Sequence, residues 1–139
     1  MHSTKNTNKT EIKNKNLYLN YVDAANNRDF SAIEKMINDE VLLNGKVSKK
    51  EDAIKGFEWI IDQIPNHHWH LEDFFLQDDR IAARLRNTGT PKEKSFYGEN
   101  KDAKSVKFSE FATYKIQNEK FVEMWFLVDT ISIIDQLKN

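Results

Sequence analysis

The stretch SVKFSEFATYKIQNEKFVEMWFLVDTISIIDQL, residues 105–137, combines two strand-like runs with one helical run. Residues 105–117 and 120–129 are rich in aromatic and β-branched side chains, and Asn118-Glu119 between them has the composition of a tight turn. The final run spaces Ile131, Ile134 and Leu137 along one side of a short helix. This stretch therefore predicts a β-hairpin followed by a closing helix.

A second hairpin is predicted upstream, over residues 68–77 and 80–90, with Asp78-Asp79 as its turn. The intervening residues 91–104 are polar and predict a long connection with one short extended piece at residues 96–98. Before the hairpin, apolar residues recur at helical spacing from a capping box at Ser48–Glu51 to Pro65.

The first third of the chain predicts two further helices, over residues 11–27 and 30–37, the second opened by a capping box at Ser31–Glu34. Residues 41–47 predict a short strand or hairpin around Asn44-Gly45. Residues 1–10 carry no apolar periodicity and are expected to form a disordered tail, so that residues 11–139 make up a single domain.

Helices gathered first and antiparallel strands gathered last predict an α+β fold rather than alternating βαβ units. A long antiparallel sheet twists and curls, and amphipathic helices packed on its concave face leave a cone with an open-ended pocket. A small-molecule cavity is thus expected from the architecture alone.

Composition excludes several classes of function. The 139 residues carry a net charge of −1, which does not favour nucleic acid as a partner. The four glycines are too far apart for a phosphate-binding loop, and no apolar run approaches the ~18 residues of a membrane span. Cysteine is absent, which excludes thiol chemistry and fits a cytoplasmic location.

The run Lys120–Leu137 resembles the closing signature of SnoaL-like polyketide cyclases, which reads roughly K-I-V-E-x-W-D-x-x-D-T-x-x-x-x-Q-L. Earlier segments are similar to the preceding strands of the same family in the same order: Trp69 with Glu72-Asp73, residues 79–84, Gly89-Thr90, Phe96-x-Gly98 and residues 114–116. The resemblance covers about residues 15–138. It implies the cone-shaped fold of nuclear transport factor 2 (NTF2-like), a homodimer formed through the sheet, and chemistry without a cofactor.

The same resemblance implies where the reactive groups of a cyclase would lie. The aspartate that follows the signature tryptophan in these enzymes matches Phe126, and their supporting histidine matches Ala112. A histidine common before the tryptophan matches Met124. Since hydrocarbon side chains cannot transfer protons, the cyclase mechanism does not carry over to this chain.

Period-two alternation identifies the strand residues that face the predicted cavity. If the reactive positions of the family face inward, then Met124, Phe126 and Val128 do so, and Glu110, Ala112 and Tyr114 face them from the preceding strand. Such side chains either select a hydrophobic ligand or simply fill the core. The expected ligand pocket comprises Tyr18, Tyr21, Phe57, Ile61, Trp69, Leu85, Ala112, Met124, Phe126 and Val128.

Glu110 is the candidate acid or base. A carboxyl group in an apolar cone has a raised pKa and can exchange protons near neutral pH. Tyr114, Tyr18 or Tyr21 would donate a hydrogen bond to a developing oxyanion. The alternative interpretations are that Glu110 is solvated at the mouth of the cone or pairs with Arg84.

Two further groups have structural explanations. His68, His70 and Glu72 share one side of a strand, but their spacing of ~6.5 Å stretches a single-ion site, and a surface or dimer-interface cluster is favoured over a metal centre. Asp129 directly precedes the last helix and is expected to cap its N-terminus.

Two functional hypotheses follow. One is a pocket protein that binds a small hydrophobic or aromatic molecule, with neither cofactor nor metal. The other is a cofactor-independent lyase, isomerase or cyclase that acts on a hydrophobic carbonyl compound with Glu110 as acid or base.

Overall fold

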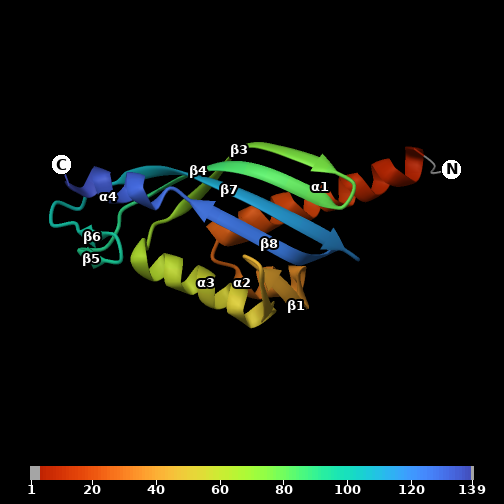
Figure 1. Cartoon of the computed structure of the whole chain (residues 1–139), viewed down its shortest axis with the longest axis horizontal. Helices are drawn as coiled ribbons and strands as arrows, with labels where there is room; N and C mark the ends of the chain where they lie inside the picture. Colours follow the sequence, from red (N-terminus) through yellow and green to blue (C-terminus); the bar gives the residue numbers. More distant parts are fainter. Residues whose placement is uncertain (1–3, 139) are drawn as a thin grey trace.

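The computed structural model describes residues 4–138, which form four helices and a curved main sheet (Figure 1). The elements are, in chain order, α1 (Thr4–Asn26), α2 (Phe30–Met36), β1 (Ile37–Leu43), β2 (Lys46–Lys49), α3 (Lys50–Gln63), β3 (His68–Gln77), β4 (Arg80–Gly89), β5 (Lys94–Ser95), β6 (Gly98–Glu99), β7 (Val106–Gln117), β8 (Lys120–Val128) and α4 (Thr130–Lys138).

The main sheet has six strands in the order β2-β1-β8-β7-β4-β3. The two long hairpins, β3–β4 and β7–β8, form as predicted and pair with one another through β4 and β7. The sheet is mixed rather than purely antiparallel, because β1 lies parallel to β8. The last strand of the chain therefore joins the early β1–β2 hairpin to the late meander.

The helices α1, α2 and α3 pack on the concave face of this sheet, while α4 closes one end beside β7 (Figure 1). Helix α1 crosses the sheet and contributes Tyr18 and Tyr21 to the main core. Helix α3 contributes Phe57, and the inner faces of β7 and β8 contribute Tyr114 and Met124. The inward faces of the strands thus meet the apolar sides of the helices, as binary patterning requires.

Helix α1 begins earlier than its apolar stripe indicates. Residues 4–10, expected to belong to a loose tail, continue the helix toward the N-terminus. They contain neither glycine nor proline, and adding turns to an existing helix costs far less than nucleating one. Residues 1–3 of the expected tail lie outside the described residues.

The caps of the short helices also differ from the predicted capping boxes. Asp29, not Ser31, caps α2, since its carboxylate accepts a hydrogen bond from the backbone N–H of Ala32 at 3.1 Å. At the start of α3, the carboxylate of Asp52 accepts a hydrogen bond from the backbone N–H of Lys49 at 2.9 Å. An aspartate therefore binds a backbone N–H group at the start of each helix.

Asp129 caps α4 as predicted, accepting a hydrogen bond from the backbone N–H of Ser132 at 3.1 Å. The buried side of α4 differs from the predicted one at a single position, where Ile133 stands in place of Ile131. Ile133 is fully buried and Ile131 is 71% exposed, while Ile134 and Leu137 are partly buried. Among the residues described, no helix is both long enough and apolar enough to cross a membrane.

Candidate functional site

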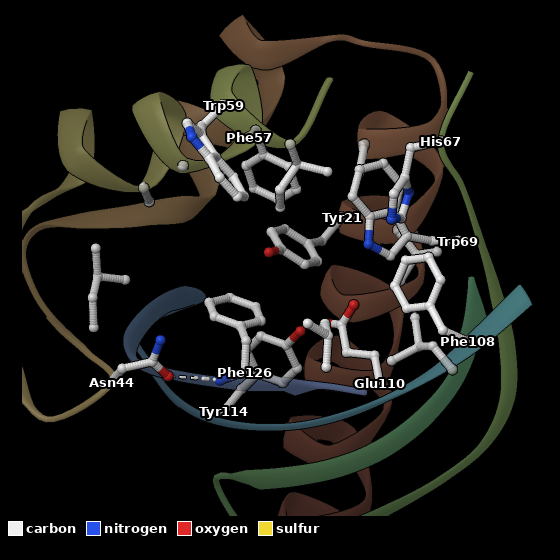
Figure 2. A pocket seen from close by; sticks show the side chains of 18 of the residues that line it. Tyr21, Asn44, Phe57, Trp59, His67, Trp69, Phe108, Glu110, Tyr114 and Phe126 are labelled. Carbon is white, nitrogen blue, oxygen red and sulfur yellow. Dashed lines mark hydrogen bonds between the residues drawn. The ribbon is translucent and has the colours of Figure 1, made fainter. Parts of the chain in front are cut away.

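A cavity of about 340 Å³ lies between α1, α3 and the inner face of the sheet (Figure 2). This volume falls within the range of small-molecule sites. Its walls are predominantly aromatic and aliphatic, and they are formed by Tyr18, Tyr21, Val22, Ala25, Leu43, Asn44, Asp52, Ala53, Gly56, Phe57, Trp59, Ile60, His67, Trp69, Leu85, Tyr97, Phe108, Glu110, Tyr114, Phe126 and Val128.

Strand register explains which side chains meet at the floor of the cavity. Glu110 of β7 lies between Leu85 of β4 and Val128 of β8, so all three side chains project from the same face. Two residues along β7, Ala112 lies opposite Phe126. The positions that the family resemblance assigns to a titratable histidine and aspartate therefore face inward and carry hydrocarbon.

Most of the residues predicted to form the pocket lie on the cavity wall. Those that do so are Tyr18, Tyr21, Phe57, Trp69, Leu85, Phe126 and Val128, together with the predicted catalytic residues Glu110 and Tyr114.

Three predicted pocket residues, Ile61, Ala112 and Met124, are not on the wall. Met124 is fully buried in the core, and the side chain of Ala112, 2% exposed, is a single methyl group. Ile61 packs partly buried against the core, because α3 presents Ala53, Gly56, Phe57 and Ile60 to the cavity instead. These three side chains belong to the main core or pack against it.

Glu110 is the buried carboxyl group at the floor, 6% exposed, and its side chain points into the cavity (Figure 2). Asn87 of β4 donates a hydrogen bond of 2.7 Å to its Oε1. Burial raises the pKa of Glu110 above its ordinary value, against smaller opposing effects of Asn87 and the Trp69 indole.

Neither alternative interpretation of Glu110 fits its surroundings. The side chain is too buried to be solvated at the mouth. Arg84 lies opposite Phe111 on the outer face of the sheet, where both side chains are exposed, so it cannot pair with Glu110. Glu110 is therefore an acid inside an apolar chamber.

Three tyrosines gather near this carboxyl group. The ring of Tyr114 lies 5.1 Å from that of Tyr18 and 5.7 Å from that of Tyr21. The hydroxyl groups of Tyr18 and Tyr21 are buried and have no hydrogen-bond partner among the described residues. Burial, followed by the proximity of Glu110, raises the pKa of both phenols. They stay protonated and can donate hydrogen bonds.

His67 also lines the cavity, although the sequence analysis did not select it. It is 3% exposed, and its Nδ1 has no hydrogen-bond partner in the described part of the chain. Burial, with smaller effects of Arg28 and His68, lowers the pKa of His67 to about 3, so the imidazole is neutral at pH 7. Period two would have indicated it, because His67 stands two residues before the inward Trp69.

His67 is held in place through its backbone. Arg28, at the α1–α2 junction, donates hydrogen bonds from its guanidinium to the carbonyl oxygens of Pro65 at 3.1 Å and His67 at 2.7 Å. Gly89 packs from the other side, and a Cβ at this position would lie only 2.4 Å from the side chain of Ile64. The imidazole itself rests against Trp69, with ring centroids 4.0 Å apart.

The mouth of the cavity lies along α3. Trp59 and Tyr97 line it, and the exposed ring of Phe96 packs on Trp59 with centroids 5.5 Å apart. Gly56 leaves open space there, since nothing lies within 4 Å of where its Cβ would be. The β5–β6 hairpin thus forms one edge of the entrance.

The histidine pair of β3 lies outside the cavity. The rings of His68 and His70 are 4.4 Å apart, and Glu72 pairs instead with Arg86 at 3.2 Å. Within residues 4–138, no group of three or more His, Cys, Asp or Glu side chains is placed to hold a metal ion.

The curved sheet, the three helices on its concave face and the enclosed cavity define an α+β cone of the NTF2-like type. The family model of the SnoaL-like polyketide cyclases matches residues 15–137, so the chain belongs to this family. No curated protein matches the chain significantly.

Solved structures share the fold over nearly their whole length. A SnoaL-like polyketide cyclase from Agrobacterium tumefaciens is 25% identical with a TM-score of 0.80, over 89% of this chain and 97% of that one. IdmH, a putative polyketide cyclase from Streptomyces antibioticus, is 15% identical with a TM-score of 0.82, over 91% and 99%. AclR, a putative hydroxylase from Streptomyces galilaeus, is 21% identical with a TM-score of 0.78, over 92% and 97%. The last two likenesses concern the fold alone.

Proposed function

We propose that this protein binds a small hydrophobic or aromatic molecule in the cavity, with the polar end of the ligand on Glu110. The observation that carries the proposal is the chamber itself: about 340 Å³ walled by aromatic rings, with one buried carboxyl group at its floor. Aromatic walls contribute affinity, and a few convergent polar groups fix orientation. We place this binding in the cytoplasm, because a chain without cysteine needs no oxidising compartment.

Two measurements test this proposal. Native mass spectrometry of the freshly purified protein should show a noncovalent adduct of small mass. Titration with 2-(2-naphthyl)ethanol should change the fluorescence of Trp59 and Trp69, which both line the cavity. Saturable binding that Phe57→Ala weakens would support the proposal, while unchanged fluorescence and an adduct-free mass would contradict it.

A second candidate function is cofactor-independent acid–base chemistry on a hydrophobic carbonyl compound. It is favoured by the position of Glu110 beside the hydroxyl-bearing rings of Tyr18, Tyr21 and Tyr114. The carboxylate would remove a proton next to the carbonyl group, and Tyr114 would donate a hydrogen bond to the oxyanion that forms.

Exchange of the α-hydrogens of 2-tetralone in D₂O tests this chemistry without knowledge of the natural substrate. Accelerated exchange that Glu110→Gln abolishes and Tyr114→Phe slows would support it. The matched control is Glu72→Gln, which makes the same change on the outer face. If the wild-type protein exchanged these hydrogens no faster than buffer alone, the acid–base function would be contradicted, while the proposed binding function would be unaffected.

We also propose that two copies pair through the outer face of the sheet. This face carries a strip of exposed apolar side chains: Phe75, Phe111, Trp125 and Leu127. Strand register places Phe111 opposite Leu127, with Trp125 two residues from Leu127 on β8; Phe75 lies further along the same face, at the other end of the row Trp125–Thr113–Ala82–Phe75. Contiguous exposed apolar surface of this kind is typical of protein interfaces.

A further inference from the structure

The charged groups of the cavity are all acidic. Of its lining residues, Glu110 lies at the floor and Asp52 at the mouth, and the lining includes no lysine or arginine among the described residues. His67 adds no positive charge, because its pKa of about 3 keeps it neutral. The cavity therefore disfavours anionic ligands. Within residues 4–138, no cationic side chain on its walls balances the acidic groups.

In the described part of the chain, Glu110 has no cationic partner. Its hydrogen bond comes from the neutral amide of Asn87. The two nearest arginines along β4 project outward: Arg84 is exposed, and Arg86 pairs with Glu72 at 3.2 Å. Burying a carboxylate without a cationic partner is costly, so burial raises the pKa of Glu110 and favours its neutral form.

Aromatic faces surround the space above the carboxyl group. Figure 2 shows Tyr21, Trp69, Tyr114 and Phe126 around the point where the Glu110 side chain ends. The ring of Tyr114 lies 5.7 Å from that of Tyr21 and 5.8 Å from that of Phe126. Several aromatic rings beside one acid are a setting that can attract an organic cation through the ring faces.

We propose that the ligand of this cavity is a hydrophobic amine, which binds as its ammonium form with the nitrogen on the Glu110 carboxylate and its apolar part among the aromatic rings. This inference rests on the proposed binding function and names its ligand class. Where Glu110 is protonated before binding, its carboxyl O–H bond breaks and the proton passes to solvent as the ammonium enters, while no bond of the amine is made or broken. The hydroxyl groups of Tyr18 and Tyr21, which have no partner in the described chain, complete the polar end.

Protonation changes at this site involve a defined set of neighbours. Several groups from different elements face Glu110: Tyr18 and Tyr21 from α1, His67 from the segment before β3, Trp69 from β3, Asn87 from β4 and Tyr114 from β7. The tyrosines remain protonated and His67 remains neutral over about pH 5 to pH 8. Proton release on binding in this range is therefore assigned to Glu110.

Calorimetry with three matched probes tests the inference: 2-(2-naphthyl)ethylamine, 2-(2-naphthyl)ethanol and 2-naphthylacetate share one ring system and differ in charge. The amine should bind at least about tenfold more tightly than the alcohol, and the carboxylate should bind most weakly. Titrations in two buffers of different ionisation enthalpy should show release of up to about one proton per bound amine, more at the acidic end of the range.

Glu110→Gln should abolish the preference for the amine and the proton release, whereas Glu72→Gln should change neither. Equal or tighter binding of the alcohol, or amine binding that Glu110→Gln leaves unchanged, would overturn the amine assignment while the binding function stands. Failure of all three probes to bind would overturn both.

Discussion

Asn87 donates a hydrogen bond of 2.7 Å to Oε1 of Glu110, and both side chains are buried between the strands β4 and β7. The donor stabilises the ionised carboxylate and so lowers the pKa of Glu110, but burial has the larger effect and raises it. This pair therefore limits how far burial raises the pKa of the acid at the cavity floor.

Asn87→Leu should raise the pKa of Glu110 further. Leucine has nearly the same volume but no hydrogen-bond donor, so the carboxylate loses the contact that favours its charged form. The ¹³C chemical shift of the Glu110 carboxyl group, followed through a pH titration, measures the change. An unchanged or lower pKa in a variant with wild-type circular dichroism would show that Asn87 does not control this group.

Glu110→Gln should stabilise the protein increasingly as the pH rises. The folded-state pKa of Glu110 lies above the ordinary value of 4.5, so the folded protein binds more protons than the unfolded chain between those two values. The free energy of unfolding therefore falls as pH rises through that interval, by at most about 1.4 kcal/mol per pH unit. Glutamine removes this loss.

Urea denaturation from about pH 4 to pH 8 checks this prediction. Glu72→Gln is the control, because its carboxylate is partly exposed and pairs with Arg86 on the surface. A Glu110→Gln variant that follows the wild-type pH profile would contradict the prediction.

His67 should have the opposite effect on stability at acid pH. Its pKa is about 3 in the folded protein against 6.5 ordinarily. Between these two pH values, the imidazole is therefore protonated in the unfolded chain but not in the folded protein. The free energy of unfolding falls as the pH drops from 6.5 toward 3, by up to about 1.4 kcal/mol per unit. His67→Gln should flatten this part of the profile, while His68→Gln, on an exposed residue, should leave it steep.

Two substitutions of Gly56 should have different effects, one on the stability of the protein and the other on ligand entry to the cavity. It lies in α3 with open space around it, so Gly56→Ala should raise the free energy of unfolding by about 0.5–1 kcal/mol through helix propensity alone. Gly56→Trp should instead fill the mouth and slow ligand association at least about tenfold in stopped-flow fluorescence. Unaltered association by the tryptophan variant would place the entrance elsewhere.

Leu127→Glu should convert the proposed dimer to monomers. Leu127 is 74% exposed on the outer face, and burying a carboxylate in an apolar interface is unfavourable. Light scattering after gel filtration measures the mass. Ile131→Glu is the control, since Ile131 is 71% exposed but lies on α4 and not on a strand of the sheet. A wild-type monomer at micromolar concentration would refute the dimer.

The sequence predicted the late strands closely and the early pairing poorly, for a physical reason. The hairpins β3–β4 and β7–β8 are local, and alternation with a two-residue turn encodes each of them. The parallel pairing of β1 with β8 joins residues about eighty positions apart, and nothing near either strand specifies it. Period two also placed Glu110 inside, because its strand alternates without interruption.

The parts of the site that were not predicted lie where regular structure ends. His67 precedes the first residue of β3, and its inward position depends on the turn after Pro65 and on Arg28, which comes from the distant α1–α2 junction. Ile133 replaced Ile131 on the buried side of α4 because the angle at which a short helix meets a sheet is a tertiary property.

The hydrogen bonds from Arg28 to the carbonyl oxygens of Pro65 and His67 have a consequence for ligand recognition. Most buried histidines are oriented through a ring nitrogen, which then has no capacity left for another molecule. In this protein Arg28 grips the peptide group instead, so the imidazole keeps its place while Nδ1 stays available. A bound ligand can thus form a hydrogen bond with Nδ1 of a neutral, rigidly positioned imidazole. Whether the ligand donates or accepts that hydrogen bond then determines the tautomer of the ring.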